Sequence, residues 1–593
     1  MSVAARAFLA GALAWMSALE PSSANPAPAP PPPLAGEELV LSSDLRVRVR
    51  QGRIIELFVL PATGEGYAEI AARVTGDARL GPVLSDWNGS RSPSPERYVR
   101  VPLSLLSDDY RALILLNLFP NDRRDGADWI HVARSGTLPT YDEGLWQVAE
   151  WFVGAGARFG EIQAVNGLQG PELRAGQEVR IPASMLHPAL SSTTGTTDNS
   201  LIFGEDQLGA YAGYRLRSGE ALYSAVVVRF TGRTASEDVL ELSRELASRS
   251  GIRDLTDIPV GHLVKIPYDV LEPEYLPSDH PRRLQAEQAK RALADALALE
   301  PVAGTRGGLE DVVVLLDPGH GGRDLGTMNN GIWEHDYVYD VSCRLRRLLR
   351  SRSQARVFMT LLDRETGCEP ASTDKLHANR QGTVQTHPPF MAREEGEAAI
   401  AVNLRWYLAN SVYHRETKAG VKSDRVVFLS LHADARHPSL RGVMVYVSGS
   451  RFPADSRSRN SATYRRYEEV RERPKAKLSQ KGRVRSEAVS RKLADEIVDS
   501  FRDHGLPVQT HKPVRDRVIR GKREWIPAVL RNNEIPAKVL VEMVNLTNGK
   551  DAALLASAAQ RERLAEALFV ALYGYFGQKA PPPPGPPAAV AGR

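Results

Sequence analysis

In the C-terminal half of the chain, short runs of apolar residues alternate with longer stretches in which apolar residues recur every three or four positions. A bounded apolar run of this length predicts a buried strand, and a spacing of three to four predicts an amphipathic helix. Strands are predicted at 312–320, 355–363, 425–434, 441–449 and 537–548, and helices at 337–352, 394–416, 486–505 and 552–577. Because strands that alternate with helices form a largely parallel sheet covered on both faces, the sequence predicts an α/β domain over 311–577.

The N-terminal half has a different pattern, in which one unit is repeated with divergence. Each copy has an amphipathic helical stretch, a second short helix, and a β-branched strand that closes on Val-Pro or Ile-Pro. Proline ends such a strand because it lacks the backbone N–H donor. The copies are predicted at 45–107, 132–187 and 214–272, with their prolines at Pro102, Pro182 and Pro267. The pattern therefore predicts three small βααβ modules ahead of the α/β domain.

The second copy has the clearest form of this pattern, with "GLWQVAEWF", "EIQAVNGL" and "LRAGQEVRIP" in that order. It resembles the lysin motif (LysM), a small βααβ module that binds glycans containing N-acetylglucosamine. The resemblance implies that the repeats bind the glycan of a cell wall. Repeats that serve only packing or protein contacts are the alternative, and no single residue is assigned as a sugar contact.

The segments outside these domains differ in composition from the folded parts. A short basic region, an apolar stretch and a small-residue sequence at the N-terminus are typical of an export signal. Proline-rich segments are expected to be extended and unfolded. The signal peptide, the Pro-rich spacer, a helical linker and the disordered Pro-rich tail are predicted at 1–24, 25–36, 280–305 and 578–593. No other segment is long and apolar enough to cross a bilayer, so we expect no transmembrane segment in the mature chain.

Composition narrows the class of partner only slightly. The 593 residues carry a formal net charge of +5 and give a pI of about 9.0. This mild positive charge suits an anionic surface such as nucleic acid, anionic lipid or an acidic wall polymer. Nucleic acid is disfavoured because the basic stretches lack interleaved aromatic residues and no recognition motif is present. Two cysteines, Cys343 and Cys368, exclude a disulfide framework and leave either one disulfide or two buried thiols.

Three polar side chains occur within or at the ends of predicted strands. His320 follows "VVVLLDPG", His432 follows "VVFLSL", and Glu542 lies inside "VLVEMVN". Sites in open α/β sheets form at the carboxyl ends of the strands. A bare buried carboxylate costs on the order of several kcal/mol, so Glu542 is expected to be protonated, paired or beside a metal.

A fourth candidate, Glu334, lies where the helix after the first strand is predicted to begin. A carboxylate there suits the positive end of the helix, and it can equally point back over the sheet edge. Two imidazoles and one carboxylate, with one position left for water, are the ligand set of a catalytic zinc site. His320, Glu334 and His432 are therefore the candidate ligands.

Four stretches of the α/β domain occur in the order of a known family. They are "LLDPGHGG", "GIWEHDY", "FLSLHADA" and "VLRNNEIPAKVLVEMVNLTN". The domain resembles the zinc-dependent N-acetylmuramoyl-L-alanine amidases, the type-3 peptidoglycan amidases. This resemblance implies that His320, Glu334 and His432 bind one Zn²⁺ ion and that Glu542 is the catalytic glutamate.

Other parts of the domain agree with the family less uniformly. The helix segment "NLRWYLAN", with Arg405 and Asn410, also matches it. Two segments depart from it: 363–391 is longer and more polar than the usual link, and 451–481 is a long basic insertion. A loop of such length is either functional or disordered, and the basic one would either attract an anionic wall or be a solvated surface loop. The remaining histidines, His335 among them, are expected to have ordinary roles.

The resemblance implies hydrolysis of the amide that joins N-acetylmuramic acid to L-alanine. Zinc would lower the pKa of its bound water, and Glu542 would take and return a proton. The expected partner is peptidoglycan, with a protein activator left open. A non-catalytic wall-binding scaffold and a zinc peptidase acting on stem peptides are the alternatives. The export signal predicts a periplasmic location, with an extracellular, wall-associated one as the alternative.

Overall fold

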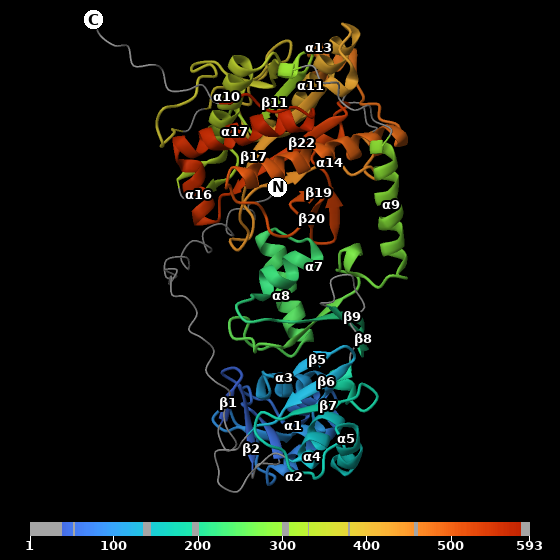
Figure 1. Cartoon of the computed structure of the whole chain (residues 1–593). Helices are drawn as coiled ribbons and strands as arrows, with labels where there is room; N and C mark the ends of the chain where they lie inside the picture. Colours follow the sequence, from blue (N-terminus) through green and yellow to red (C-terminus); the bar gives the residue numbers. More distant parts are fainter. Residues whose placement is uncertain are drawn as a thin grey trace, which may run out of the picture. The chain divides into compact units, whose positions relative to one another are not determined.

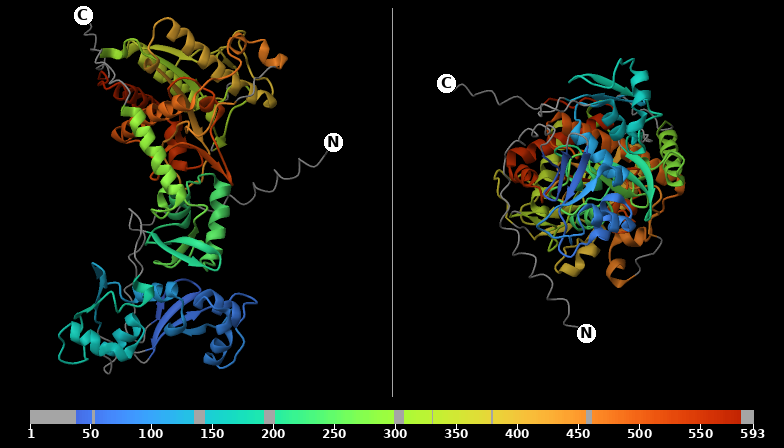
Figure 2. Two further views of the ribbon diagram at one scale, coloured as in Figure 1. Left: turned by 90° about the vertical axis from the view of Figure 1, so that its right-hand side faces the viewer. Right: turned by 90° about the horizontal axis from the view of Figure 1, so that it is seen from below.

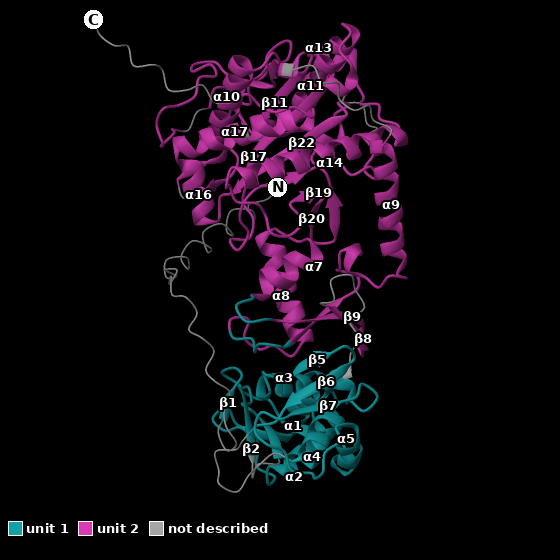
Figure 3. Ribbon diagram, in the orientation of Figure 1, with its two compact units in different colours: residues 1–192, 217–220, 257–262 teal, residues 193–216, 221–256, 263–593 magenta. Residues whose placement is uncertain are grey.

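The structure, a computed structural model, describes residues 38–50, 54–134, 144–191, 201–298, 307–329, 331–377, 380–455 and 461–582. The predicted signal peptide and spacer, and most of the predicted tail, lie outside the described residues. The chain divides into two compact units (Figure 3), each described by itself below. Unit 1 comprises 1–192, 217–220 and 257–262, and unit 2 comprises 193–216, 221–256 and 263–593. Most of the predicted third repeat therefore belongs to the same unit as the α/β domain.

Unit 1 contains the first two predicted repeats, each with two helices between two strands. Its strands are β1 (Glu38–Val40), β2 (Leu45–Arg50), β3 (Ile54–Val59), β4 (Val99–Pro102), β5 (Arg123–Asp125), β6 (Asp128–Val132) and β7 (Glu178–Ile181). Its helices are α1 (Tyr67–Thr75), α2 (Gly81–Trp87), α3 (Asp108–Leu118), α4 (Leu145–Val148), α5 (Phe159–Val165) and α6 (Pro188–Ser191). Strands β1–β4 and β5–β7 form two antiparallel sheets, and one hydrophobic core that includes Leu57, Leu113 and Phe152 joins the two repeats.

In unit 2, the third repeat has the same order of elements. Its sheet has the order β10-β9-β8, and two helices lie between β9 and β10 in the sequence. The elements are β8 (Leu201–Asp206), β9 (Gly209–Arg215), α7 (Arg229–Thr231), α8 (Ser236–Arg249) and β10 (Leu263–Pro267).

One side-chain hydrogen bond recurs in all three repeats. The acceptor is a side chain that follows the second helix and directly precedes a glycine. The donor is a backbone N–H of the closing strand, two positions before its final proline. The pairs are Asn88–Arg100, Asn166–Arg180 and Ser250–Lys265, at 2.8, 2.8 and 2.9 Å. Short polar side chains that bond the backbone fix local loop geometry. The same contact thus ties the second helix to the closing strand in each repeat.

The α/β domain of unit 2 contains a six-stranded sheet with the order β14-β11-β17-β22-β18-β19. Strands β14, β11, β17 and β22 are parallel to one another, whereas β18 is antiparallel to β22 and β19 is parallel to β18. The strands are β11 (Val313–Pro318), β14 (Arg356–Met359), β17 (Val426–Asp434), β18 (Met444–Tyr446), β19 (Val514–Arg515) and β22 (Ala537–Asn545). The mainly parallel sheet predicted from the sequence is confirmed.

Helices cover both faces of this sheet (Figures 1 and 2). They are α10 (Glu334–Arg352), α11 (Ala398–Lys418), α14 (Gln480–Asp503), α15 (Ala528–Arg531), α16 (Gly549–Ala556) and α17 (Ala558–Tyr575), and the linker helix α9 (Pro281–Ala298) lies against α14. Val314 and Leu316 of β11 pack in one core with α10, α14 and α17, and Val313 and Leu315 pack in another with α11 and α15. Each such buried side chain stabilises the fold by about 2 kcal/mol. Burial on both sides explains why the strands read as continuous apolar runs.

The strand predicted at 355–363 is interrupted. The N–H of Thr360 still donates to the carbonyl of Leu316 at 2.9 Å, but the carbonyl of Thr360 accepts from Gln385, also at 2.9 Å. The chain leaves the main sheet at this point, and β15 (Leu361–Asp363) pairs with β16 (Gly382–Val384) instead. The closing helix predicted at 552–577 is likewise divided, because Ser557 between α16 and α17 has an extended backbone.

The two segments that depart from the family pattern are partly folded. In the basic segment, α12 (Ala462–Arg465) and α13 (Glu468–Glu472) flank Tyr467, which is fully buried in the core that includes α11. The described part of this segment is therefore not a wholly solvated loop, because it contributes a buried side chain to the core. In the other segment, Cys368 forms a disulfide with Cys343 of α10. The alternative of a disulfide, left open by the sequence, is the one found.

None of the helices among the described residues is both long and apolar enough to span a membrane.

Lys538, near the start of β22, predicts a pH dependence of stability. The residue is 1% exposed, and its ammonium group donates to Ser486 Oγ at 2.5 Å and to the Ile535 carbonyl at 3.0 Å. Burial lowers the pKa of Lys538 from 10.5 to about 7. Between these two values the unfolded chain binds the proton and the folded chain does not, so the free energy of unfolding rises with pH across this range.

We expect Lys538→Met to remove this rise and to stabilise the protein at pH 7 by on the order of a few kcal/mol. Urea unfolding of both proteins at pH 7 and pH 10 would measure the difference. A stability difference that is the same at both pH values would contradict the assignment of the titration to Lys538.

Candidate metal centre

Strand β11 ends in Asp-Pro-Gly-His, and this ending places His320 at the carboxyl edge of the sheet. His320 has a φ of 61°, in the left-handed region, and the N–H of Gly319 donates to the carbonyl of Leu431 at 2.8 Å. A Cβ atom on Gly319 would lie 2.5 Å from Cε1 of His432. Only glycine permits this approach, so the residue beside the first histidine makes room for the second.

Glu334 and His432 form a compact cluster with His320. His432 lies in β17, which neighbours β11, and Glu334 is the first residue of α10 and 3% exposed. Oε2 of Glu334 lies 3.2 Å from Nε2 of His320, and Oε1 lies 3.1 Å from Nδ1 of His432. One donor atom from each residue lies within 4.8 Å of the others. Two imidazoles and a carboxylate in this arrangement have the chemistry of a zinc site with an open position.

Backbone groups fix the orientation of the Glu334 carboxylate. The N–H of Ala433 donates to Oε1 at 3.1 Å, and the N–H of Thr327 donates to Oε2 at 3.0 Å. The sequence left open whether the Glu334 side chain stays at the helix end or points back over the sheet edge. The structure has it over the sheet edge. The start of α10 therefore brings a carboxylate to the two strand ends.

The electrostatics of the cluster favour a cation. Burial raises the pKa of Glu334, but His320 and His432 beside it hold that pKa well below its usual value. Burial lowers the pKa of His320, but Glu334 and Asp324 outweigh it and raise that pKa to about 10. A metal ion would take the place of the proton that this setting attracts, because metal ligands bind in their deprotonated forms.

Two supporting residues, Asp324 and His335, were not predicted from the sequence. Oδ1 of Asp324 lies 2.9 Å from Nδ1 of His320, which leaves Nε2 of that ring facing Glu334. Carboxylates in this position commonly orient metal-binding histidines. Nδ1 of His335 lies 3.0 Å from the carbonyl of Gly319, and burial lowers the pKa of His335 to about 4, so this ring is neutral. The local sequence "GRDLG", with an acid four residues after His320, is the one signal that could have indicated Asp324.

Arg405 of α11 contacts the end of β11, just before His320. It donates to Oδ1 of Asp317 at 2.7 Å, and Ser430 of β17 donates to Oδ2 of the same carboxylate, also at 2.7 Å. All three side chains are buried, and a buried charge requires this kind of pairing. Asp317 thereby connects β11 to both β17 and α11, three residues before His320.

Asn410 lies outside the cluster. Its side chain donates to the carbonyl of Asn532 at 2.9 Å and accepts from the N–H of Glu534 at 2.7 Å. These contacts hold the loop that leads into β22. The resemblance that singled out Asn410 thus corresponds to a structural contact.

Glu542 lies in β22 with its Cα paired to that of His432 in the sheet register. It is 9% exposed, and its Oε2 has no hydrogen-bond partner among the described residues. Burial, followed by the charges of Asp434 and Glu334, raises the pKa of Glu542 well above its usual value, against the effect of Arg436. Glu542 is therefore a proton-binding group at the edge of the cluster rather than one of its three members.

His320, Asp324, Arg405, His432 and Glu542 line one groove of about 490 Å³. Its wall is formed by the strand ends, by α11 and by the segment that follows β19. The lining residues include Asp317, His320, Asp324, Val402, Arg405, His432, Arg436, Tyr446, Val518, Arg520, Trp525, Pro527 and Glu542. A concave site with a few convergent polar groups and shifted pKa values is the usual form of an active site.

Comparison with known proteins gives a family match within this domain. Residues 314–573, less than half of the chain, match a family model described as N-acetylmuramoyl-L-alanine amidase. The match covers the strands and helices that carry His320, Glu334, His432 and Glu542, so the domain is supported as a peptidoglycan amidase domain.

Individual relatives bear similar names. The N-acetylmuramoyl-L-alanine amidases AmiA of Salmonella typhimurium and Escherichia coli are 24% and 25% identical over 271 residues, which are 44% of this chain and 76% of each relative. Among solved structures, the N-acetylmuramyl-L-alanine amidase Ami1 from Mycobacterium smegmatis is 20% identical, covers 47% of this chain and 99% of its own, and has a TM-score of 0.29.

Proposed function

We propose that this protein is a zinc-dependent N-acetylmuramoyl-L-alanine amidase that cleaves the amide between N-acetylmuramic acid and L-alanine in peptidoglycan. The observation that carries the proposal is the convergence of His320, Glu334 and His432 within 4.8 Å. His320 and His432 line a groove that also contains Glu542. The match of residues 314–573 to the amidase family supports the same reaction.

His320, Glu334 and His432 would hold the ion, which would supply a Lewis acid for the scissile carbonyl and would lower the pKa of an attacking water. Asp324 and the backbone of Ala433 keep the ligands oriented, which is a common task of outer-shell partners. These residues therefore prepare the site before substrate arrives.

Glu542 would act as the general base and then as the general acid. Its carboxylate would take the proton of the attacking water and return it to the nitrogen of L-alanine as the amide bond breaks. Its raised pKa suits a group that must hold a proton and pass it on during the reaction. The guanidinium of Arg436, which is paired with Asp434, counters part of this rise.

Digestion of purified sacculi tests the reaction. We expect the protein with zinc to release peptides that begin with L-alanine, identified by mass spectrometry, and to leave glycan strands with free lactyl carboxylates. Peptides cut within the stem would instead support a zinc peptidase. Binding to sacculi without any release would support a non-catalytic scaffold.

We further propose that the repeats of unit 1 bind wall glycan. A groove of about 590 Å³ is lined by residues of both repeats, among them Pro102, Trp146, Glu150 and Glu172, and by Arg111 of the helix between them. Trp146 is 46% exposed, and its ring presents an apolar face beside charged and polar groups. Such a mixture suits a sugar, which has both apolar and hydroxyl-bearing faces.

The N-terminal export signal predicted from the sequence supports a periplasmic or wall-associated location for this activity.

A further inference from the structure

One wall of the groove is formed by residues that have no role in the reaction proposed above. This wall is the hairpin of β20 (Val518–Arg520) and β21 (Arg523–Trp525), whose register pairs Val518 with Trp525 and Ile519 with Glu524. Successive side chains of a strand point to opposite faces. Val518, Arg520 and Trp525 therefore share one face, and all three line the groove.

This face of the hairpin carries side chains without partners. Trp525 is 44% exposed, and its indole side chain has neither a ring contact nor a hydrogen bond with any described residue. Arg520 is exposed and forms no ion pair within the described part of the chain. The other groove arginines are already neutralised, because Arg405 is paired with Asp317 and Arg436 with Asp434. Of the three arginines that line the groove, Arg520 is therefore the one without a carboxylate partner among the described residues.

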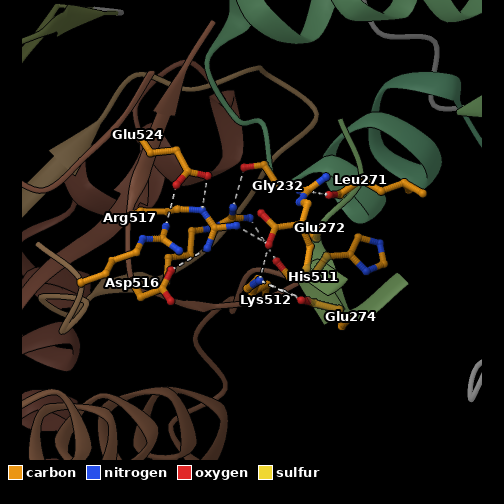
Figure 4. A network of polar contacts seen from close by, with 12 residues as sticks. Gly232, Leu271, Glu272, Glu274, His511, Lys512, Asp516, Arg517 and Glu524 are labelled. Carbon is orange, nitrogen blue, oxygen red and sulfur yellow. Dashed lines mark hydrogen bonds and ion pairs between the residues drawn. The ribbon is translucent and has the colours of Figure 1, made fainter. Parts of the chain in front are cut away.

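The opposite face of the hairpin is anchored. Glu524 lies 3.0 Å from Nε of Arg517 and 2.7 Å from Nη2 of Arg451. Arg517 in turn lies 2.6 Å from Glu272, a carboxylate that is 4% exposed and that also pairs with Lys512 at 2.8 Å (Figure 4). Charge pairs at such low exposure are worth more than surface pairs. The strand leading into the hairpin is thus held by the end of the third repeat.

Two further contacts join the same elements. Arg515 donates to the carbonyl of Gly232 at 2.7 Å, and the N–H of Gly521, in the hairpin turn, donates to Asp238 at 3.1 Å. Gly232 and Asp238 belong to the third repeat, which lies in the same compact unit. The hairpin is therefore pre-positioned, and a ligand loses less free energy in ordering it.

We propose that Arg520 and Trp525 form a subsite for the stem peptide, in which Arg520 binds a carboxylate of that peptide and Trp525 packs against its apolar atoms. Beyond L-alanine the stem peptide carries carboxylates, and a guanidinium matches the planar shape of a carboxylate through paired N–H donors. The proposal rests on the amidase function proposed above and specifies which part of the substrate the hairpin recognises.

Two soluble muramoyl-peptide substrates test this subsite. They differ only in the second stem residue, whose α-carboxylate is free in one and amidated in the other. We expect Arg520→Gln to raise KM about tenfold for the free carboxylate, with kcat unchanged, and to leave KM for the amidated substrate unchanged. Trp525→Ala should raise KM for both substrates. Lys522→Gln, in the hairpin turn and outside the groove lining, is the matched control and should change neither.

An Arg520→Gln variant that affects both substrates equally, or neither, would overturn the subsite. A second measurement separates this outcome from failure of the proposed function, because calorimetric titration of the stem tripeptide into Glu542→Gln protein needs no turnover. Preferential binding of the free-carboxylate tripeptide, lost in the Glu542→Gln and Arg520→Gln double variant, would support the subsite even if the wild-type protein released no product. Equal binding of the two tripeptides would refute the subsite even in an active amidase.

Discussion

Replacing Glu542 by glutamine should lower kcat on sacculi by on the order of 10³-fold and leave the bound metal in place. Glutamine has nearly the same size and keeps the packing of β22, but it cannot take a proton from water. Because Glu542 is outside the three-residue cluster, metal content should remain at one ion per chain. Rates of peptide release, together with elemental analysis of the purified protein, measure both effects.

Asp503→Asn, at an exposed position at the end of α14, is the matched control and should retain full activity. A Glu542→Gln protein that keeps more than a tenth of the wild-type rate would assign proton transfer to a different group. Loss of metal along with activity would instead make Glu542 a ligand, contrary to its position at the edge of the cluster.

Removing one member of the metal cluster should have an equally large effect through a different route. We expect Glu334→Gln and His432→Ala to lose the metal and to lower activity by more than the 10- to 100-fold typical of outer-shell partners. A chelator should inactivate the wild-type protein, and added zinc should restore it. Zinc should also raise the melting temperature of the wild-type protein, since a ligand that binds only the folded state stabilises it.

In the cluster variants, this zinc-dependent rise should disappear. His377→Ala is a suitable control because His377 is exposed and distant in sequence from all three ligands. A variant of Glu334 that binds zinc as tightly as the wild type would show that the cluster is not the metal centre.

The main sheet could be predicted from the sequence because its strands are buried on both faces and therefore stand out as unbroken apolar runs. His320 and His432 could be predicted for a related reason, since each follows such a run and neighbouring parallel strands end at the same edge. The break at Thr360 could not, because the apolar pattern of 355–363 continues across a point where the chain changes its hydrogen-bond partners.

The contacts that support the site could not be predicted from local sequence patterns. His335 reads as a helix residue beside a candidate ligand, and its role depends on reaching the carbonyl of Gly319, 16 residues earlier. The pairing of Glu272 with Arg517 joins residues 245 positions apart. Such contacts have no periodicity in the sequence. The hydrogen bond shared by Asn88, Asn166 and Ser250 was easier to predict. Its acceptor precedes a glycine in every repeat, so an alignment of the three repeats could have revealed it.

The anchoring of the hairpin by Glu272 bears on where the catalytic part of this protein begins. A fragment cut at residue 314, where the family match starts, would lack Glu272 and the whole third repeat. Lys512 and Arg517 would then lose their shared carboxylate, and Arg515 would lose the carbonyl it bonds. A fragment that keeps these contacts should accordingly start before Leu201, which makes the third repeat an integral part of the compact unit that contains the metal cluster.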